Sequence, residues 1–268
     1  VKDPITIESN KTIQHALEIM NHFNISGVPV EDDGILIGIL TNRDIRFETD
    51  LDLKVADRMT KNNLITVNKG TTLEEAKTVL QKHRIEKLLV VDKSGALAGL
   101  ITVKDILKKE NHPNAATDMH GRLLVGAAIG VSEETIERAQ ALVNAQVDVL
   151  VVDTAHGHSK GVLDIVKKLR SIFSDIEIIA GNVATKEGTQ ALVESGVNAI
   201  KVGIGAGSSC TTRMIAGVGV PQLTAVQDAF EYAHKHDIPI ISDGGMRYSG
   251  DIAKSFAAGA ETVMLGGI

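Results

Sequence analysis

Residues 147–205 read VDVLVVDTAHGHSKGVLDIVKKLRSIFSDIEIIAGNVATKEGTQALVESGVNAIKVGIG. Within this stretch the short apolar runs VDVLVVDTA, IEIIAGNVA and AIKVGIG alternate with helices that we expect near residues 160–173 and 186–195. Because the runs are apolar on both faces, they are typical of strands in a parallel sheet that is covered by helices. The stretch therefore predicts consecutive βα units.

The same alternation extends to both sides of this stretch. The run LLVGAAIGV precedes it, and the runs IPIISDGG and TVMLGGI follow it, which gives six strands. We predict an α/β fold that holds about six of the eight βα units of a TIM-type (β/α)8 barrel; a complete open, doubly wound sheet is the alternative. The remaining helices are expected near residues 132–145, 221–236 and 249–258.

An internal repeat occupies the first part of the chain. Residues 3–47 and 63–109 each predict a short strand, a helix, a strand, a turn, a strand and a second helix. Each copy is too small to bury a core alone, so we expect a pseudo-symmetric pair that shares one buried face. The polar, Pro-containing stretch ENHPNAATDMHG reads as a linker. The predicted domains are repeats at 1–48 and 49–109, a linker at 110–121 and a partial barrel at 122–268.

The composition narrows the possible functions. The chain has 268 residues, a net charge of −6 and 43% hydrophobic residues, which suits a folded protein rather than a nucleic-acid binder. Its single Cys excludes a disulfide framework and fits a reducing, cytoplasmic location. No run of about 20 apolar residues predicts a membrane span. The chain starts at Val1 without a signal pattern and stops abruptly at Ile268, so we expect a piece of a longer protein.

Polar residues gather where the predicted strands end, which is where parallel folds bind ligands. Asp153 ends one run and Asn182 ends the next. With His156 and His158, Asp153 invites a metal interpretation, but no third ligand is apparent, and a solvated loop whose Asp meets a polar ligand is the plainer alternative.

The loop GIGAGSSCTTR, residues 203–213, follows another strand and carries the only thiol. Cys210 in this polar setting is a candidate nucleophile with a lowered pKa; a buried, inert Cys is the alternative.

Two Gly-rich turns follow the last two strands, at Gly244-Gly245 and Gly266-Gly267. Glycine lets backbone N–H groups approach a phosphate, although Gly also ends strands for purely structural reasons. Asp243 could accept hydrogen bonds from ribose hydroxyls or cap the next helix.

The repeats carry a matched Thr-x-x-Asp turn. Thr41 aligns with Thr102 and Asp44 with Asp105, at a spacing of 61 residues. Each pair could bind a ribose or phosphate, or could simply cap a helix.

Together these motifs resemble the inosine-5′-monophosphate (IMP) dehydrogenase family. The repeats resemble a tandem pair of cystathionine-β-synthase (CBS) domains, which that family inserts into its barrel after the second βα unit. The strings DTAHGHS, AGNVAT, KVGIGAGSSCTTR, AGVGVPQ, DGGMRYSGDIAK and VMLGG are similar to family motifs and stand in family order. The resemblance covers nearly the whole chain.

The resemblance implies a reaction. Cys210 would attack C2 of IMP, hydride would pass to NAD, and water positioned by Thr212 would release xanthosine monophosphate from a covalent thioimidate. The implied substrate contacts are Ser208, Asp243, Gly244, Gly245, Gly266 and Gly267. The implied NAD contacts are Asp153, Asn182, Gly203, Ile204 and Gly205. The carbonyls of Gly205, Gly207 and Cys210 would bind a potassium ion.

The family also implies a homotetramer, with octamers through the CBS pairs, and regulation by purine nucleotides at Thr41, Asp44, Thr102 and Asp105. Ser209, Ala206 and Gly267 depart from the residues usual in the family. The family's first two barrel units and its mobile flap are missing from this stretch, so we expect it alone to be a poor catalyst. Guanosine monophosphate (GMP) reductase and a non-catalytic nucleotide sensor are the alternatives.

Overall fold

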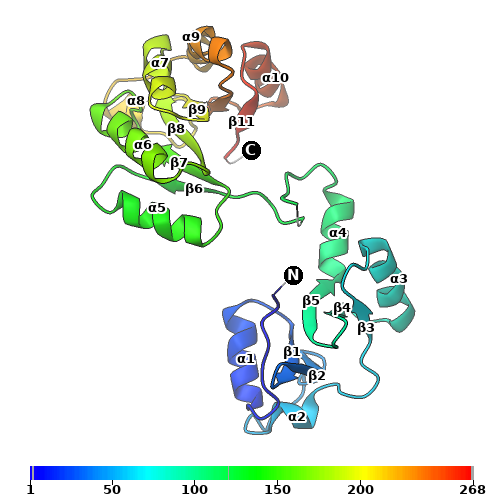
Figure 1. The fold of residues 1–268 in the computed structure, drawn as a ribbon. Helices are drawn as coiled ribbons and strands as arrows, with labels where there is room; N and C mark the ends of the chain where they lie inside the picture. Colours follow the sequence, from blue (N-terminus) through cyan, green and yellow to red (C-terminus); the bar gives the residue numbers. More distant parts are fainter. Residues whose placement is uncertain (2, 120, 267–268) are drawn as a thin grey trace. The chain divides into compact units, whose positions relative to one another are not determined.

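The computed structural model describes residues 1, 3–119 and 121–266. The chain divides into two compact units, Val1–Ala115 and Ala116–Ile268 (Figure 1). The division falls inside the stretch that was expected to be a linker.

The second unit is built on one parallel sheet of six strands, in the order β11-β10-β9-β8-β7-β6. Every strand therefore pairs with its neighbours in the sequence, and the order never reverses. A doubly wound sheet requires such a reversal, so its alternative is wrong. The strands are β6 Gly126–Ile129, β7 Val149–Asp153, β8 Glu177–Val183, β9 Ala199–Val202, β10 Ile240–Asp243 and β11 Thr262–Met264.

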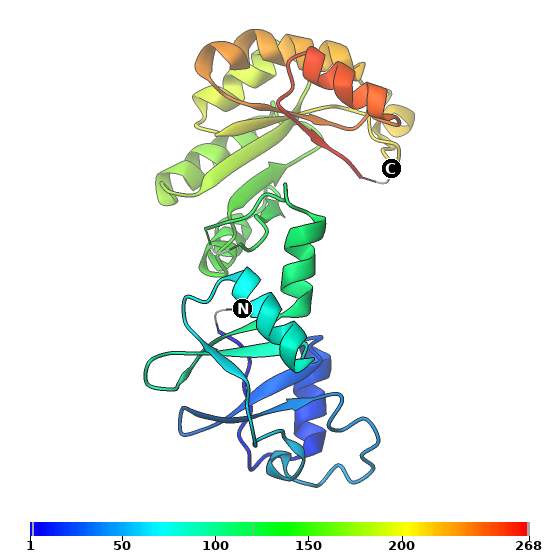
Figure 2. The same cartoon turned by 90° about the vertical axis from the view of Figure 1, so that its right-hand side faces the viewer.

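Helices cover one face of this sheet (Figure 2). Each of the larger ones packs on the next: α6 on α7, α7 on α9 and α9 on α10. A single outer layer over a curled parallel sheet is the arrangement of a TIM-barrel-type fold, here in the form of a half-barrel. The helices are α5 Thr135–Asn144, α6 Lys160–Ile172, α7 Lys186–Glu194, α8 Thr212–Ile215, α9 Gln222–Ala233, the 3-10 turn η1 His234–His236 and α10 Ser249–Ala257.

The expected burial of the central strands is confirmed. In β8, Ile178 and Ala180 are fully buried, and β9 is buried along its whole length from Ala199 to Val202. At the edges of the sheet, by contrast, Leu123, which precedes β6, is 63% exposed, and Met264, in β11, is 42% exposed. The sheet thus has a sealed centre and apolar margins.

The second repeat follows its predicted order. Thr72 caps α3 through a reciprocal pair of bonds with Glu75, and Thr102 caps α4 in the same way with Asp105. These caps satisfy N–H groups that a helix start leaves without partners. Its elements are β3 Thr66–Asn68, α3 Leu73–His83, β4 Lys87–Val91, β5 Leu97–Thr102 and α4 Val103–Asn111.

The first repeat departs from its prediction in two places. Its opening strand is reduced to a single bridge between Ile7 and Val30. Its expected second helix is absent, because the chain after Thr41 forms turns instead. The segment beyond these turns contacts the start of α1. The carbonyls of Leu53 and Leu51 accept hydrogen bonds from the first N–H groups of α1. Its described elements are α1 Ile13–His22, β1 Gly27–Asp32 and β2 Ile35–Thr41, followed by the short α2 Val55–Arg58.

The predicted linker is more ordered than expected. Helix α4 continues into it as far as Asn111. Beyond the division, Leu124 N donates to Ala116 O at 3.0 Å, and Asp118 N donates to Arg122 O at 2.8 Å. This tight turn leads directly into β6. No helix in the described ranges is long and apolar enough to cross a bilayer.

Candidate functional site

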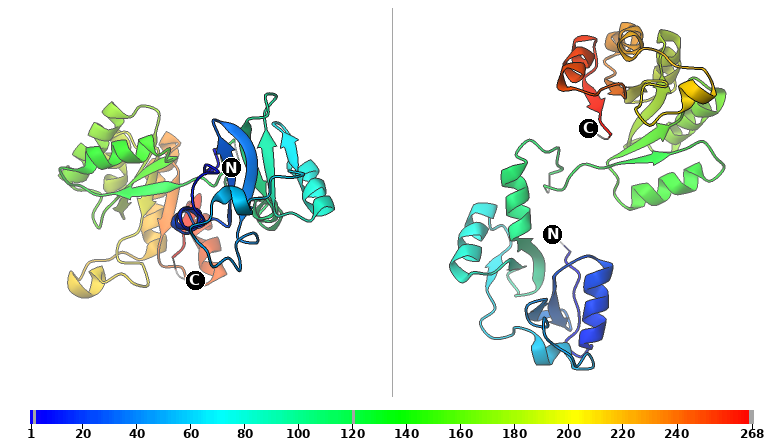
Figure 3. Two further views of the ribbon diagram at one scale, coloured as in Figure 1. Left: turned by 90° about the horizontal axis from the view of Figure 1, so that it is seen from below. Right: turned by 180° about the vertical axis from the view of Figure 1, so that it is seen from behind.

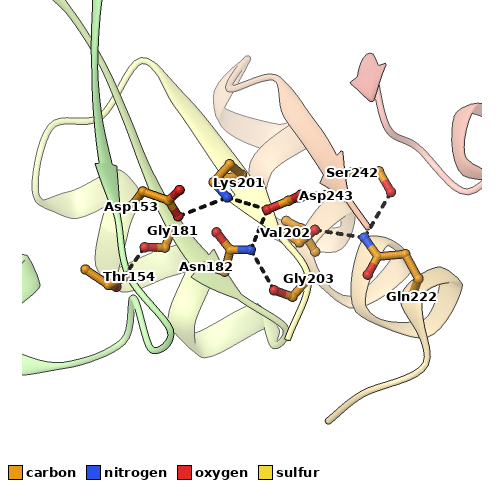
Figure 4. A network of polar contacts seen from close by, with 10 residues as sticks. All are labelled: Asp153, Thr154, Gly181, Asn182, Lys201, Val202, Gly203, Gln222, Ser242 and Asp243. Atoms are coloured by element: carbon orange, nitrogen blue, oxygen red, sulfur yellow. Dashed lines mark hydrogen bonds and ion pairs between the residues drawn. The ribbon is translucent and has the colours of Figure 1, made fainter. Parts of the chain in front are cut away.

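Three charged side chains meet at the carboxyl ends of the strands (Figure 4). Lys201, on β9, lies between Asp153 at the end of β7 and Asp243 at the end of β10. Its Nζ is 3.0 Å from Asp153 Oδ1 and also pairs with Asp243 Oδ2. The lysine side chain is 3% exposed, whereas those of Asp153 and Asp243 are 44% and 22% exposed. A buried cation therefore supports two carboxylates that face outward.

Asn182, at the end of β8, joins the same cluster. Its Nδ2 donates to Gly203 O at 2.7 Å and to Asp243 Oδ2 at 2.8 Å. Its Oδ1 is buried without a hydrogen-bond partner among the described residues. An unpartnered buried acceptor is costly, so this oxygen is available for a donor on a ligand.

Gln222, at the start of α9, forms a second amide contact beside the cluster. Its Nε2 donates to Val202 O at 2.8 Å and to Ser242 Oγ at 3.0 Å. Its Oε1 is likewise buried and unpartnered within the described part of the chain. Two strand ends, β9 and β10, are thereby tied to the helix that follows the Cys loop.

Gly203 is required where β9 turns into this loop. Its φ is +148°, and a Cβ there would lie 2.1 Å from Asp243 O. A side chain would push β9 and β10 apart, so only glycine permits this approach.

Cys210 lies beyond that turn, in a loop that leads to α8 and extends away from the strand ends (Figure 3). The thiol is exposed, and its Sγ is 3.3 Å from Thr212 Oγ1. Hydrogen bonding to the side chain of Thr212, then to backbone groups of Thr212 and Gly205, and the charge of Arg213 lower the pKa of Cys210. The alternative of a buried Cys is wrong, because the thiol is exposed. An exposed thiol with a lowered pKa is a competent nucleophile.

The Gly244-Gly245 turn packs against the backbone of the Cys loop. Both residues have positive φ, and a Cβ on Gly244 would lie 2.8 Å from Gly207 N. The expected phosphate turn and the nucleophile loop are thus in direct contact.

The other expected substrate residues are more scattered. Ser208 is exposed in the Cys loop, and Gly266 is exposed beyond β11 with open space around it. Gly267 lies outside the described residues.

Metal ligation has limited support in the geometry. The rings of His156 and His158 are 6.5 Å apart, and no group of three metal-ligating side chains occurs in the described ranges. Of the carbonyls expected at the potassium site, that of Gly207 accepts a hydrogen bond from Cys210 N at 3.1 Å, which closes a tight turn in the loop.

The repeat unit contains a cleft at each Thr-x-x-Asp turn. The Thr41 cleft, of about 370 Å³, is lined by Thr41, Asp44, Arg43 and Arg46 together with Lys87. Within it, Thr41 donates to Asp44 Oδ2 at 2.6 Å, although no helix follows to be capped.

The Thr102 cleft, of about 570 Å³, is lined by Thr102, Asp105, Lys104 and Lys108, and again by Lys87. Here the pair does cap a helix, since Thr102 and Asp105 exchange hydrogen bonds at the start of α4. Lys87 Nζ donates to Ser26 Oγ at 2.9 Å, and burial lowers the pKa of this amine. One half-buried lysine therefore serves both clefts.

Comparison with known proteins identifies the family. Residues 13–268 match the profile described as IMP dehydrogenase / GMP reductase domain. The chain belongs to this family. It is 57% identical over 269 residues to the inosine-5′-monophosphate dehydrogenase of Aquifex aeolicus, covering 99% of this chain and 55% of the relative. It is 56% identical to that of Halalkalibacterium halodurans, covering 100% and 56%. The chain thus spans about half the length of these relatives.

Solved structures of other proteins are also similar to this chain. A GMP reductase from Trypanosoma brucei in complex with guanosine 5′-triphosphate has a TM-score of 0.86 and 38% identity, covering 100% of this chain and 65% of that one. A cysteine-to-alanine variant in complex with guanosine 5′-monophosphate has a TM-score of 0.85 and 38% identity, covering 99% and 57%. Both belong to the reductase branch that the family's name includes.

In this IMP dehydrogenase / GMP reductase chain, the structure brings together Asp153, Asn182, Gly203 and Asp243, which were expected to meet ligands. Lys201 and Gln222 were missed. A signal for Lys201 was present, because it is the one charged residue in the otherwise apolar run AIKVGIG. Gln222 carried no comparable signal at a helix start.

Proposed function

We propose that this chain carries the nucleotide-oxidising centre of an IMP dehydrogenase. The observation that carries this proposal is the exposed Cys210 with its lowered pKa, on a loop that rests against the Gly244-Gly245 turn. A purine C–H carbon becomes a hydride donor after a nucleophile has added to it, which is why the chemistry needs a thiolate. The identity to IMP dehydrogenases supports the same assignment.

The reaction balances as two steps at C2 of IMP. The thiolate of Cys210 would form a bond to C2, and the hydride on C2 would pass with its electron pair to bound NAD, giving a thioimidate and NADH. Water then adds to C2, the C–S bond breaks, and xanthosine monophosphate and the thiol are released. Thr212, whose hydroxyl is 3.3 Å from Sγ, would stabilise the thiolate and orient the water. Such a product would feed guanine nucleotide synthesis.

The nucleotide would be held by Ser208, by the turn Gly244-Gly245 and by Gly266 and Gly267. Asp243 would accept hydrogen bonds from ribose hydroxyls. One of its oxygens, Oδ2, already pairs with Lys201 and Asn182, which leaves the other for the ribose. Backbone N–H groups at glycine turns are suited to phosphate.

The residues near Asp153 fit an NAD site. Asp153 is 44% exposed, and the unpartnered Asn182 Oδ1 can accept a donor such as a carboxamide. Gly203, Ile204 and Gly205 would allow close approach of the backbone. When bound, NAD supplies the hydride acceptor; the protein's part is to orient it and exclude water.

A potassium ion would be held by the carbonyls of Gly205, Gly207 and Cys210. Hard cations prefer oxygen ligands, and these three carbonyls belong to one short loop that is turned by the bond from Cys210 N to Gly207 O. Its role would be to fix the position of the nucleophile.

The repeats would act as a CBS pair that binds purine nucleotides and regulates the enzyme. Two clefts of matched position, each containing a hydroxyl, a carboxylate and cations, support this role. A solved relative binds guanosine 5′-triphosphate. Exposed apolar residues at the edges of the sheet, such as Met264 in β11, fit assembly into a homotetramer. We place the enzyme in the cytoplasm, as in the family it resembles. Octamers would form through the repeats.

The first test mixes the protein with IMP, NAD and potassium and follows NADH absorbance. Appearance of NADH that is lost in Cys210→Ala supports the dehydrogenase. The second candidate, GMP reductase, is favoured by the solved relatives, and it requires turnover of GMP with NADPH instead. Nucleotide binding at the repeats without either turnover, in the full natural polypeptide that carries these 268 residues, contradicts both.

A further inference from the structure

The neighbouring strands explain how the buried side chain of Lys201 reaches Asp153. The strand registers align Asp153 with Gly181 and Gly181 with Lys201, so the glycine lies between the two charged residues. A Cβ on Gly181 would lie 2.8 Å from Lys201 Cβ. The glycine therefore leaves the space through which the lysine side chain crosses β8 to reach Asp153.

The charges around Lys201 are balanced only in part. Asp153 and Asp243 both contact Nζ, so one cation holds two carboxylates that would otherwise repel each other. Lys201 is 3% exposed and cannot itself touch a ligand, whereas Asp153 is exposed and Asp243 is partly exposed. Asn182 donates to the same oxygen of Asp243, which fixes that side chain from a second direction.

We propose that Lys201 is a positioning residue that sets the mutual geometry of Asp153 and Asp243. This inference rests on the proposed function, in which Asp153 faces NAD and Asp243 faces the ribose of IMP. Lys201 then links the two halves of the site and aligns the reacting carbon with the hydride acceptor. Small misalignments of reacting groups have large effects on rate.

The test compares Lys201→Met and Lys201→Arg with the wild type in the full natural polypeptide that carries these 268 residues. Lys201→Met is expected to lower kcat by about 10²-fold at saturating IMP and NAD and to weaken IMP binding, measured by calorimetry. Lys201→Arg keeps a cation between the carboxylates and is expected to restore most of both. Unchanged kcat and unchanged IMP affinity in Lys201→Met overturn the proposal.

A purely structural role is separated by a matched control. Arg170→Met removes another partly buried cation of the same unit, far from the strand ends that hold Asp153 and Asp243. It is expected to lower the melting temperature without changing kcat or IMP affinity of the folded enzyme. If Lys201→Met behaves like Arg170→Met, Lys201 is structural and the proposal is wrong.

A second variant keeps the test valid if Lys201→Met folds poorly. Asp153→Asn removes one of the two charges that Lys201 balances. In a double-mutant cycle, Lys201→Met with Asp153→Asn is expected to cost little more than the larger single effect, because the pair acts as a unit. If the effects of the two single substitutions multiply in the double variant, the proposal is wrong.

Failure of the proposed function gives a different result. If the wild type turns over GMP with NADPH but not IMP with NAD, the dehydrogenase assignment is wrong, and the same variants are scored on GMP turnover. If the wild type binds neither nucleotide, both proposals are wrong.

Discussion

The two ends of the six-stranded sheet each hold a cation, and they use it differently. At the carboxyl ends, Lys201 is paired with the exposed carboxylates of Asp153 and Asp243. At the amino ends, Arg170 donates to the carbonyls of Gly196, at 3.0 Å, and of Ile176, at 3.0 Å. Carboxylates on exposed side chains can also bind a ligand, whereas backbone carbonyls are fixed in place. A cation therefore indicates a site only when its partners remain accessible.

The largest effect is expected from removing Cys210, the proposed nucleophile, from the loop that follows β9. Cys210→Ala should lower kcat/KM by more than about 10³-fold, because the hydride cannot leave before a thiolate has added. Ser209→Ala, at the neighbouring position, should retain activity. Steady-state NADH production measures both, and comparable losses would contradict the assignment of the nucleophile.

The second-largest effect is expected from removing Arg170, the cation at the amino ends of the strands. Arg170→Met should lower the free energy of unfolding by about 2 to 3 kcal/mol, because several acceptors lose a charged donor. Turnover of the folded enzyme should not change. Urea unfolding with an activity assay below the transition checks this, and a loss of activity without a loss of stability would remove the distinction between the two ends.

A third cation sharpens the comparison, since Lys87 is held by a hydroxyl rather than by carboxylates or carbonyls. Lys87→Met should weaken nucleotide binding to the repeats about tenfold in both clefts, because a charged contact is lost in each. Arg43→Met should affect the Thr41 cleft alone. Calorimetric titration with ATP and GTP resolves the two clefts, and loss in only one cleft for Lys87→Met would show that the lysine is not shared.

The pH dependence of this binding has a defined sign. Burial lowers the pKa of Lys87, and a phosphate prefers the charged amine. Affinity should therefore fall as the pH rises through that lowered pKa, and Lys87→Met should lose this part of the profile. An identical profile in the variant would assign the pH dependence to another group.

The smallest effect concerns the reactivity of the thiol. Hydrogen bonding to the Thr212 side chain is the largest cause that lowers the pKa of Cys210. Thr212→Val should raise this pKa, while the backbone contacts keep it below the ordinary value. The rate of iodoacetamide alkylation against pH gives the midpoint. Thr211→Val is the control, because Thr211 is not among the groups that lower the pKa of Cys210.

The sequence predicted the sheet closely but not the cluster at its end. The strands were predicted from runs that are apolar on both faces, because a parallel sheet covered by helices buries both faces of its strands. Lys201 was read as part of such a run, and its partners follow from registers across three strands, which no local pattern encodes. Asp153 and Asp243 were found because they end their strands.

The matched turns of the repeats show the same limit. Thr102 and Asp105 cap a helix whose Ile106 is buried in the core of its repeat. Thr41 and Asp44 have the same spacing, but the chain beyond them supplies carbonyls to α1 instead of forming a helix. Equal motifs thus gave different structures because their tertiary partners differ.

The sequential order of the sheet also determines how the site is assembled during synthesis. Each strand pairs with the one made just before it, so the sheet can grow by one βα unit at a time as the chain leaves the ribosome. Asp153, Asn182 and Lys201 enter in that order, and Asp243 arrives only with β10. Until then Lys201 has one carboxylate partner instead of two, so the charged cluster is complete only after β10 has joined the sheet.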